Sequence, residues 1–234
     1  MYCGDQWNTY WHGTRLSHIL RLIKAIMFQS CLDVGCAEGF YLRLISGLID
    51  SDELSTIGLD VAKNYLLKAK KEVDEGSWVL GDSHRLPFRN NSFDLILCLE
   101  VLEHLANPEM AFTELARVSG KYILISVAGE NLFYHFAKRL RLVRQEDPYT
   151  KIGGGHIHEM EISKIIYDWA PKAGCENLGS VTTCHFPASF LQRHRMPSFF
   201  VPIARLIDTL IDKMPVVRER AAVQVALLEK SRDA

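Results

Sequence analysis

The feature that most constrains the fold of this chain is an alternation, between residues 30 and 127, of short apolar runs with longer segments of helical spacing. The runs are short and rich in β-branched, aromatic or leucine residues, as strands are, and the segments between them place apolar residues every three to four positions. Strands separated by helices of about a dozen residues predict a parallel sheet with right-handed crossovers. The expected strands are Ser30–Val34, Thr56–Leu59, Trp78–Leu80, Phe93–Leu99 and Lys121–Val127, and the expected helices are Gly39–Ile49, Ala62–Val73 and Pro108–Val118.

The rest of the chain is less regular but still predicts ordered elements. A helical run covers Leu16–Phe28, a helix is expected at Met160–Ala170, and strands are expected at Gly179–Cys184 and Ala222–Leu228. Phe186–Pro215 contains four prolines and is expected to be a helical insertion that these prolines break. No linker divides the chain, so we expect one domain over residues 1–234. Its parts are an N-terminal helical lid (1–29), a ligand-binding core (30–127) and a substrate-side segment with the last strands (128–234).

Composition and charge narrow the class of protein. With 48% hydrophobic and 24% charged residues and a net charge of −1, the chain has the balance of a soluble globular protein. A protein that binds phosphate backbones usually has a basic excess, so nucleic acid is not the expected partner. The six cysteines form no CxxC pair, which argues against a metal site and favours buried free thiols in a reducing compartment. No secretion signal or apolar run of membrane-spanning length is visible, and we expect a cytoplasmic protein, with peripheral membrane contact left open.

The strongest local motif is Leu-Asp-Val-Gly-Cys-Ala-Glu-Gly at residues 32–39, between the first strand and the first helix. Small residues there let the backbone turn sharply and approach a ligand at the carboxyl edge of the sheet. The spacing Gly35-x-Ala37-x-Gly39 differs from the G-x-G-x-x-G pattern that faces a pyrophosphate. Asp33 and Glu38 bring negative charge to the turn, which favours a ligand that carries positive charge.

Two further acidic positions follow at the ends of the next strands. Asp60 lies 21 residues after Gly39 (60 − 39), close to the spacing at which an acid binds ribose hydroxyls. Asp82, just past the third strand, can accept a hydrogen bond from an adenine amine, and Ser83 offers an amide and a hydroxyl. For Ser83, a simple polar turn explains the residue equally well.

Together with LPF at residues 86–88, NNSFDLILCLEVLEHL at 90–105 and AFTELARV at 111–118, these motifs make the segment from Ser30 to Val127 resemble the class I methyltransferases. Within them, it resembles the group that methylates small molecules, quinones and lipids. The resemblance implies S-adenosylmethionine as cofactor, whose sulfonium and ammonium meet the expectation of a cationic ligand. It also implies a doubly wound, Rossmann-like α/β fold with seven strands, helices on both faces and an antiparallel last strand, for which Ala222–Leu228 is the candidate.

The resemblance also implies roles for individual residues. Asp60 would bind the ribose, and Glu100, at the end of the fourth strand, would face the methionine end of the cofactor. Ala37 departs from the family, which more often has glycine there, but alanine is small enough that we expect binding to survive. The remaining implied contacts are Asp33, Gly35, Ala37 and Gly39 with the methionine and ribose, and Asp82 and Ser83 with the adenine.

Candidates for catalysis and acceptor binding lie outside these motifs. Methyl transfer needs a general base only if the acceptor must lose a proton, and Glu103 and His104 are the candidates. The four-residue spacing of Glu100 and His104 would let the two share a helical face. His156 and His158 follow three glycines and are candidate substrate contacts, although they could simply begin the next helix. Their HxHE pattern is too small for a metal site. The aromatic residues that precede the first helical run could close over the cofactor or only pack; they are Trp7, Tyr10 and Trp11, with His12 beside them.

Two segments combine basic and apolar residues, and three functions stay open. The segments are Leu132–Arg144 and the part of Phe186–Pro215 around Arg193, Arg195 and Arg205, and they are either solvated helix faces or a cover for an anionic or lipid-linked acceptor. The leading function is methylation of a small or lipid-linked molecule by in-line displacement. The alternatives are a nucleic-acid methyltransferase and a non-catalytic cofactor-binding partner protein. The run Leu99-Glu100-Val101-Leu102 lacks the Asn/Asp-Pro-Pro-aromatic pattern of amino-directed nucleic-acid enzymes.

Overall fold

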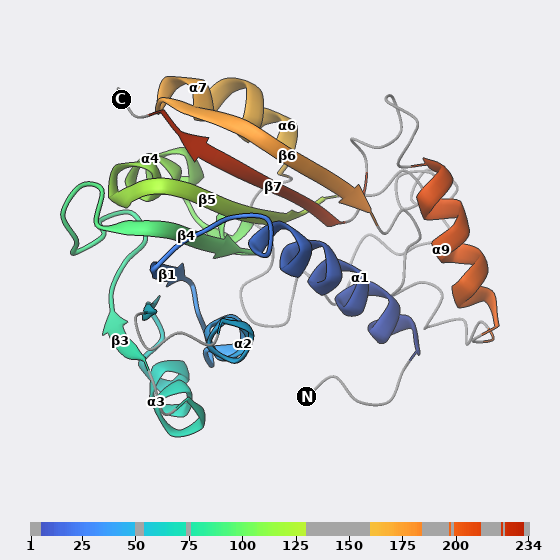
Figure 1. Ribbon diagram of the computed structural model, residues 1–234, viewed down its shortest axis with the longest axis horizontal. Coiled ribbons are helices and arrows are strands. Elements are labelled where there is room, and N and C mark those ends of the chain that lie inside the picture. The colour runs from blue at the N-terminus through green and yellow to red at the C-terminus, as the bar shows by residue number, and fades with distance from the viewer. Residues whose placement is uncertain are drawn as a thin grey trace.

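The computed structural model describes residues 6–49, 54–73, 76–129, 160–183, 197, 199–211, 221 and 223–231, without the side chains of residues 6–9. The central sheet has the strand order β3-β2-β1-β4-β5-β7-β6, in which β1 to β5 are parallel and β7 is antiparallel to both neighbours. The seven-stranded Rossmann-like sheet with an antiparallel last strand is therefore confirmed (Figure 1). Its strands are β1 (Ser30–Val34), β2 (Ser55–Asp60), β3 (Ser77–Leu80), β4 (Phe93–Leu99), β5 (Ser119–Ala128), β6 (Cys175–Thr183) and β7 (Val223–Lys230).

The helices lie on both faces of the sheet. One face is covered by α1, α2 and α9, whose buried residues form one apolar cluster with Leu95, Leu97 and Val225. The other face is covered by α4 and by the helical stretch of α6, η3 and α7, which form a second cluster with Leu32, Ile96 and Ile125. The bounds are α1 (Gln6–Ile23), α2 (Phe40–Leu48), α3 (Lys63–Glu72), the 3₁₀ turn η1 (Leu102–His104), α4 (Pro108–Val118), α6 (Ile162–Lys164), the π turn η3 (Ile165–Trp169), α7 (Ala170–Lys172) and α9 (Phe200–Ile211).

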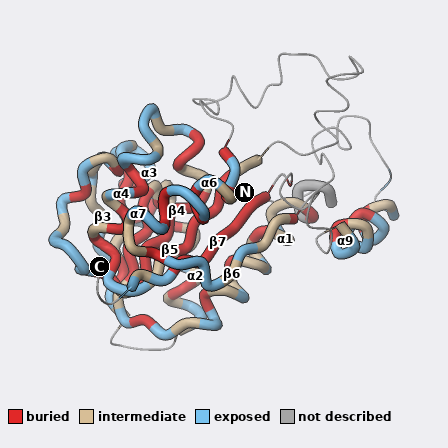
Figure 2. Tube along the Cα trace, turned by 90° about the horizontal axis from the view of Figure 1, so that it is seen from above, coloured by how far each residue is buried: buried red, intermediate tan, exposed pale blue. Residues whose placement is uncertain are grey.

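Figure 2 shows where the chain is buried. The central strands are buried almost throughout, and the exposed residues gather on the outer sides of the helices and in the turns. This is why β1, β4 and β5 have nearly continuous apolar sequences, as strands covered on both faces do. No helix in the described part of the chain is long and apolar enough to cross a membrane.

Three elements differ from the sequence expectation. Helix α1 begins at Gln6 rather than Leu16, because the stretch before Leu16 packs against other elements: Tyr10 is fully buried and its hydroxyl donates to Asp208 of α9. The same helix ends at Ile23 rather than Phe28. Strand β6 begins at Cys175, four residues before the expected start, because its polar first residues pair with β7 along the edge of the sheet. Of the proline-rich insertion, residues 200–211 form a single helix, since Pro202 falls within the first turn of α9.

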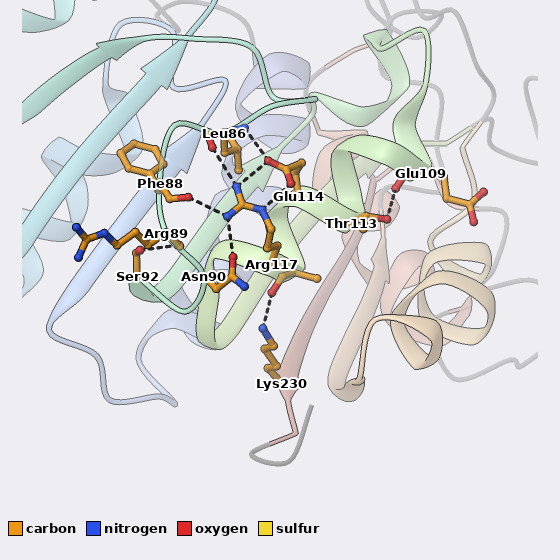
Figure 3. A network of polar contacts seen from close by, with 11 residues as sticks. Leu86, Phe88, Arg89, Asn90, Ser92, Glu109, Thr113, Glu114, Arg117 and Lys230 are labelled. Carbon is orange, nitrogen blue, oxygen red and sulfur yellow. Dashed lines mark hydrogen bonds and ion pairs between the residues drawn. The ribbon is translucent and has the colours of Figure 1, made fainter.

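The loop from β3 to β4 is fastened to α4 by one arginine (Figure 3). Arg117 donates to the carbonyl oxygens of Leu86 at 3.0 Å and Phe88 at 2.8 Å, and it pairs with Glu114 at 2.6 Å. Glu114 in turn accepts from the Leu86 amide at 2.8 Å. The loop that carries Asp82 and Ser83 is thus held by α4, which gives the AFTELARV segment a structural role.

Candidate functional site

The turn at residues 35–39 lies at the carboxyl end of β1, where the backbone takes three left-handed positions. Gly35, Ala37 and Gly39 have φ values of 76°, 47° and 75°. Glycine suits such values because it has no Cβ, and alanine does so only with some strain. The amides of Gly35 and Cys36 donate to the Leu59 carbonyl oxygen at 2.8 and 3.1 Å, so the turn is tied to the end of β2.

Asp60 organises this turn directly. One carboxylate oxygen accepts from the Ala37 amide at 2.9 Å and the other accepts from the Ala62 amide at 2.7 Å. The side chain is 8% exposed, and each carboxylate oxygen can accept a second hydrogen bond. Asp60 is therefore placed to shape the turn and to accept ligand hydroxyls at the same time.

A tryptophan explains the small residues around the turn. The ring of Trp78 on β3 packs over β2, and a Cβ built on Gly58 would lie 2.5 Å from that ring and 2.8 Å from the Cys36 sulfur. A Cβ on Gly39 would also meet the Trp78 ring at 2.5 Å. Packing against Trp78 thus requires glycine at both positions, and at Gly39 the left-handed φ favours glycine as well.

Four carboxylates gather at this edge of the sheet, and we call Asp33, Asp60, Glu100 and Glu103 the acidic cluster. Asp33 and Glu103 are 2% and 0% exposed. Burial, with a smaller contribution from Asp60, raises the pKa of Asp33 to about 7. Burial, with a smaller contribution from Glu100, raises the pKa of Glu103 to about 8. Asp33 and Glu103 are therefore partly protonated at neutral pH, and a cation bound beside them would favour their ionised forms.

Several carboxylate oxygens of the acidic cluster accept no hydrogen bond from the described part of the protein. Within the described part of the chain, one buried carboxylate oxygen each of Asp33, Glu100 and Glu103 has no hydrogen-bond partner. The other Glu103 oxygen accepts from the Ala128 amide at 2.9 Å. Buried carboxylate oxygens without donors are costly, and a bound ammonium or sulfonium would offset that cost. These acceptor oxygens at the edge of the sheet fit a cationic ligand of the S-adenosylmethionine type.

The N-terminal helix reaches this edge through an arginine that the sequence analysis missed. Arg15, 8% exposed, forms an ion pair with Glu100, which follows β4 with a strained φ of 60°. His12, one turn earlier on α1, lies 3.4 Å from Arg15. Burial first, and then the Arg15 charge, lower the pKa of His12, so its imidazole is neutral at neutral pH. The available signal was the spacing of Arg15, Ile19 and Ile23, which puts a charge on the buried face of the helix.

The remaining predicted residues fall into three groups. Asp82 is exposed and accepts from the backbone and ring nitrogens of His84 at 2.9 and 2.7 Å, while Ser83 beside it is buried. His104 is exposed at the end of η1 and does not share a helical face with Glu100, because the chain leaves β4 in a left-handed residue and then makes a single 3₁₀ turn. His156 and His158 lie outside the described residues, as do Leu132–Arg144, Arg193 and Arg195, whereas Arg205 lies on α9.

The four described cysteines are buried in the protein. Cys31, Cys36, Cys98 and Cys175 are buried free thiols, as expected, and burial raises the pKa of each of them.

Comparison with known proteins agrees with the geometry. Residues 32–124 match the family model described as a methyltransferase domain. The chain is 34% identical over 104 residues to an uncharacterized protein of Methanocaldococcus jannaschii, a match that covers 43% of this chain and 42% of that protein. It is 27% identical over 122 residues to the ubiquinone biosynthesis O-methyltransferase of Nitrosomonas europaea, covering 50% of this chain and 51% of that one. The chain thus spans about half the length of the curated relatives it matches, or somewhat less.

Solved structures share the fold over nearly the whole chain. The magnesium protoporphyrin IX methyltransferase of Synechocystis, solved with bound S-adenosylhomocysteine, superposes with a TM-score of 0.64 at 12% identity. The superposition covers 97% of this chain and 86% of that one. At this identity the likeness concerns the fold.

Proposed function

Because residues 32–124 form a class I methyltransferase domain, for which S-adenosylmethionine is the cofactor, we propose that this chain transfers a methyl group to a small-molecule or lipid-linked acceptor. The observation that carries the proposal is the acidic cluster, with its unpaired oxygens, beside the turn at residues 35–39. A buried site of this charge suits a cofactor with two positive groups better than it suits a pyrophosphate.

Different residues at this edge of the sheet would bind different parts of the cofactor. Asp33 and Glu100 would bind the methionine end, where the ammonium supplies the missing donors, and the turn residues would lie against the methionine and ribose. Asp60 would accept from the ribose hydroxyls while it holds the turn, and Asp82 with Ser83 would lie at the adenine. Arg15 would hold Glu100 in place from α1.

The bound cofactor supplies an electrophilic methyl carbon on a sulfonium. An acceptor with a lone pair would take this methyl group by in-line displacement, so the task of the protein's own residues would be to position the acceptor and the cofactor and to exclude water. Helix α1 suits this task, because it brings Arg15 and His12 over the acidic cluster.

An acceptor that loses a proton needs a base within reach. We keep Glu103 and His104 as candidates and add His12, which is neutral and lies next to Arg15. Replacing His12 or His104 by alanine in turn separates these two, since only the base lowers the turnover number at saturating cofactor.

The nature of the acceptor is supported by the surface of α9 and by a relative that acts in ubiquinone biosynthesis. The outer side of α9 exposes large apolar residues, which suits an acceptor with an apolar tail. His156 and His158 stay candidate acceptor contacts.

The first test is calorimetric titration with S-adenosylmethionine, S-adenosylhomocysteine and NAD. We expect heat from the first two and none from NAD. Asp60→Ala should weaken cofactor binding by about 2–3 kcal/mol while the protein stays folded by circular dichroism. Binding of NAD alone, or unchanged affinity in a folded Asp60→Ala protein, contradicts the site.

The second test is turnover with methyl-labelled cofactor against three pools: lipid extract, water-soluble metabolites and total RNA. We expect label in the lipid or metabolite pool. Label in RNA alone supports the nucleic-acid alternative, and cofactor binding without label in any pool supports a non-catalytic partner protein.

A further inference from the structure

A second hollow lies away from the acidic cluster, between α1, β6 and α9. This cleft has a volume of about 670 Å³. Helical spacing puts its α1 residues on a different side of that helix from Arg15 and Ile19, so α1 separates the cleft from the cofactor edge. Figure 1 shows α1 and α9 on the same side of the sheet, near its β7–β6 end. The described lining residues are Gly13, Thr14, Ser17, His18 and Arg21 of α1, Ser180, Val181, Thr182 and Thr183 of β6, and Arg205, Asp208 and Thr209 of α9.

Two arginines bring positive charge to the described lining of the cleft. Arg21 and Arg205 come from its two helical walls, both are exposed, and neither forms an ion pair with a described residue. The one acid in the described lining is Asp208, which is buried and accepts a hydrogen bond from the Tyr10 hydroxyl. That bond joins α1 to α9, so the two walls are held in place before anything binds.

Hydroxyl groups supply further donors. The Ser17 and Thr209 hydroxyls donate within their own helices, to the carbonyl oxygens of Thr14 at 2.7 Å and Arg205 at 2.9 Å. Thr14, Ser180 and Thr182 use their hydroxyls in no hydrogen bond with a described residue. Two guanidinium groups with several free hydroxyls form a donor set that matches a phosphate group.

Gly13 leaves one wall of the cleft open. It lies inside α1, where glycine lowers helix stability relative to alanine, yet a Cβ built on it would meet nothing within 4 Å. Packing within the described protein therefore does not require glycine at this position. A ligand that approaches the helix backbone closely would require glycine at residue 13, because a Cβ there would keep the ligand away.

An apolar stripe runs along α9 beside the cleft. Ile203, Leu206 and Leu210 follow one another at intervals of three and four residues, which places them on one side of α9, and Phe199 directly precedes the helix. Phe199, Ile203, Leu206 and Leu210 are 64%, 47%, 62% and 55% exposed. Arg205 and Thr209 face the cleft on the neighbouring side of the same helix. A phosphate in the cleft and an apolar chain on the stripe would thus bind to one continuous surface.

We infer that the cleft between α1, β6 and α9 binds the phosphate group of an anionic amphiphile whose apolar part lies along the α9 stripe. The assignment of this cleft to the acceptor rests on the proposed function. Its assignment as a binding site for an anionic amphiphile does not rest on that function, because binding can be measured without turnover.

The experiment compares two pairs of variants of the full chain. Arg21→Gln with Arg205→Gln removes both charges of the cleft, and Lys70→Gln with Lys71→Gln removes two exposed charges from α3 as a matched control. Each protein is sedimented with vesicles of phosphatidic acid in phosphatidylcholine and with vesicles of phosphatidylcholine alone, and is titrated with inorganic phosphate. Gly13→Ala is compared with Gly47→Ala, whose added Cβ on α2 also meets nothing within 4 Å.

We expect the wild type to bind phosphatidic acid vesicles more tightly than inorganic phosphate and to bind phosphatidylcholine vesicles weakly. The cleft double variant should lose about tenfold or more in affinity for phosphatidic acid, and the Lys70/Lys71 variant should not. Gly13→Ala should weaken binding and Gly47→Ala should not. Equal losses in both double variants, binding of inorganic phosphate without vesicle binding, or no binding of either ligand would overturn the inference. Cofactor titration of the same wild-type protein reports separately on the proposed function.

Discussion

Arg15 of α1 and Glu100, which directly follows β4, form an ion pair across the cofactor edge of the sheet. The pair joins an N-terminal helix to a residue held at a φ of 60°. Because Arg15 is almost completely buried, this ion pair is part of the packed edge of the site and not a contact on the protein surface.

Removing the arginine should therefore be felt by the cofactor. Arg15→Met keeps the apolar stem but leaves Glu100 without its cation, and we expect S-adenosylmethionine affinity to fall about tenfold. Calorimetric titration measures this, with Lys24→Met, an exposed lysine just after α1, as the control. Equal affinities in the two variants would show that Arg15 only packs.

The raised pKa of Glu103 gives a pH dependence of stability with a definite sign. Between its ordinary value of 4.5 and its folded value of about 8, the native protein holds a proton that the unfolded chain releases. Stability from this group is thus lost as pH rises through that range. Glu103→Gln should gain at least about 1 kcal/mol relative to wild type between pH 5 and pH 8 without cofactor. Urea unfolding at both pH values measures it, and an unchanged difference between the two proteins speaks against the shift.

Cofactor binding should release protons near neutral pH. A cation beside Asp33 and Glu103 stabilises their ionised forms, whose pKa values of about 7 and 8 leave them partly protonated in the free protein. Affinity for S-adenosylmethionine should therefore rise between pH 6.5 and 8.5. Titrations in buffers of different ionisation enthalpy count the protons released. Proton uptake would mean that these carboxyls do not face the cofactor's charge.

Ala37 has a backbone conformation that glycine adopts more easily. With φ at 47°, Ala37→Gly should raise the free energy of unfolding by about 1 kcal/mol, since it removes strain at the turn. Ala173→Gly, at a φ of −95°, should instead lower stability. Thermal and urea unfolding of both proteins test the contrast, which fails if the two changes have the same sign.

Arg117 should matter for stability through the loop it holds. Arg117→Ala leaves the Leu86 and Phe88 carbonyl oxygens without this donor and should cost about 2 kcal/mol. Arg117→Lys should recover only part of this stability, because one ammonium cannot reach both carbonyl oxygens and Glu114 as the planar guanidinium does. A lysine variant as stable as wild type would mean that charge alone suffices.

The strands and the cofactor turn could be predicted from the sequence because each carries a local signal. Strands β1 and β4 have the expected bounds, and Gly35, Ala37 and Gly39 mark a turn that only small residues tolerate. Helix α1 could not be placed, since its first turns have no apolar repeat and are stabilised by tertiary contacts such as Tyr10 with Asp208. The Arg15–Glu100 pair depends on that placement, so the sequence identified Glu100 but not its partner.

The position of β7 has a consequence for biosynthesis. This strand comes last in the sequence, yet it lies between β5 and β6 and pairs with both. During translation, β6 has no neighbour in the sheet until residues 223–230 have left the ribosome, and one edge of β5 stays open until then. Because β6 also lines the cleft, that site forms only after the sheet closes. A nascent chain stalled before Val223 would therefore present an open strand edge to chaperones, and one released there would be prone to aggregate.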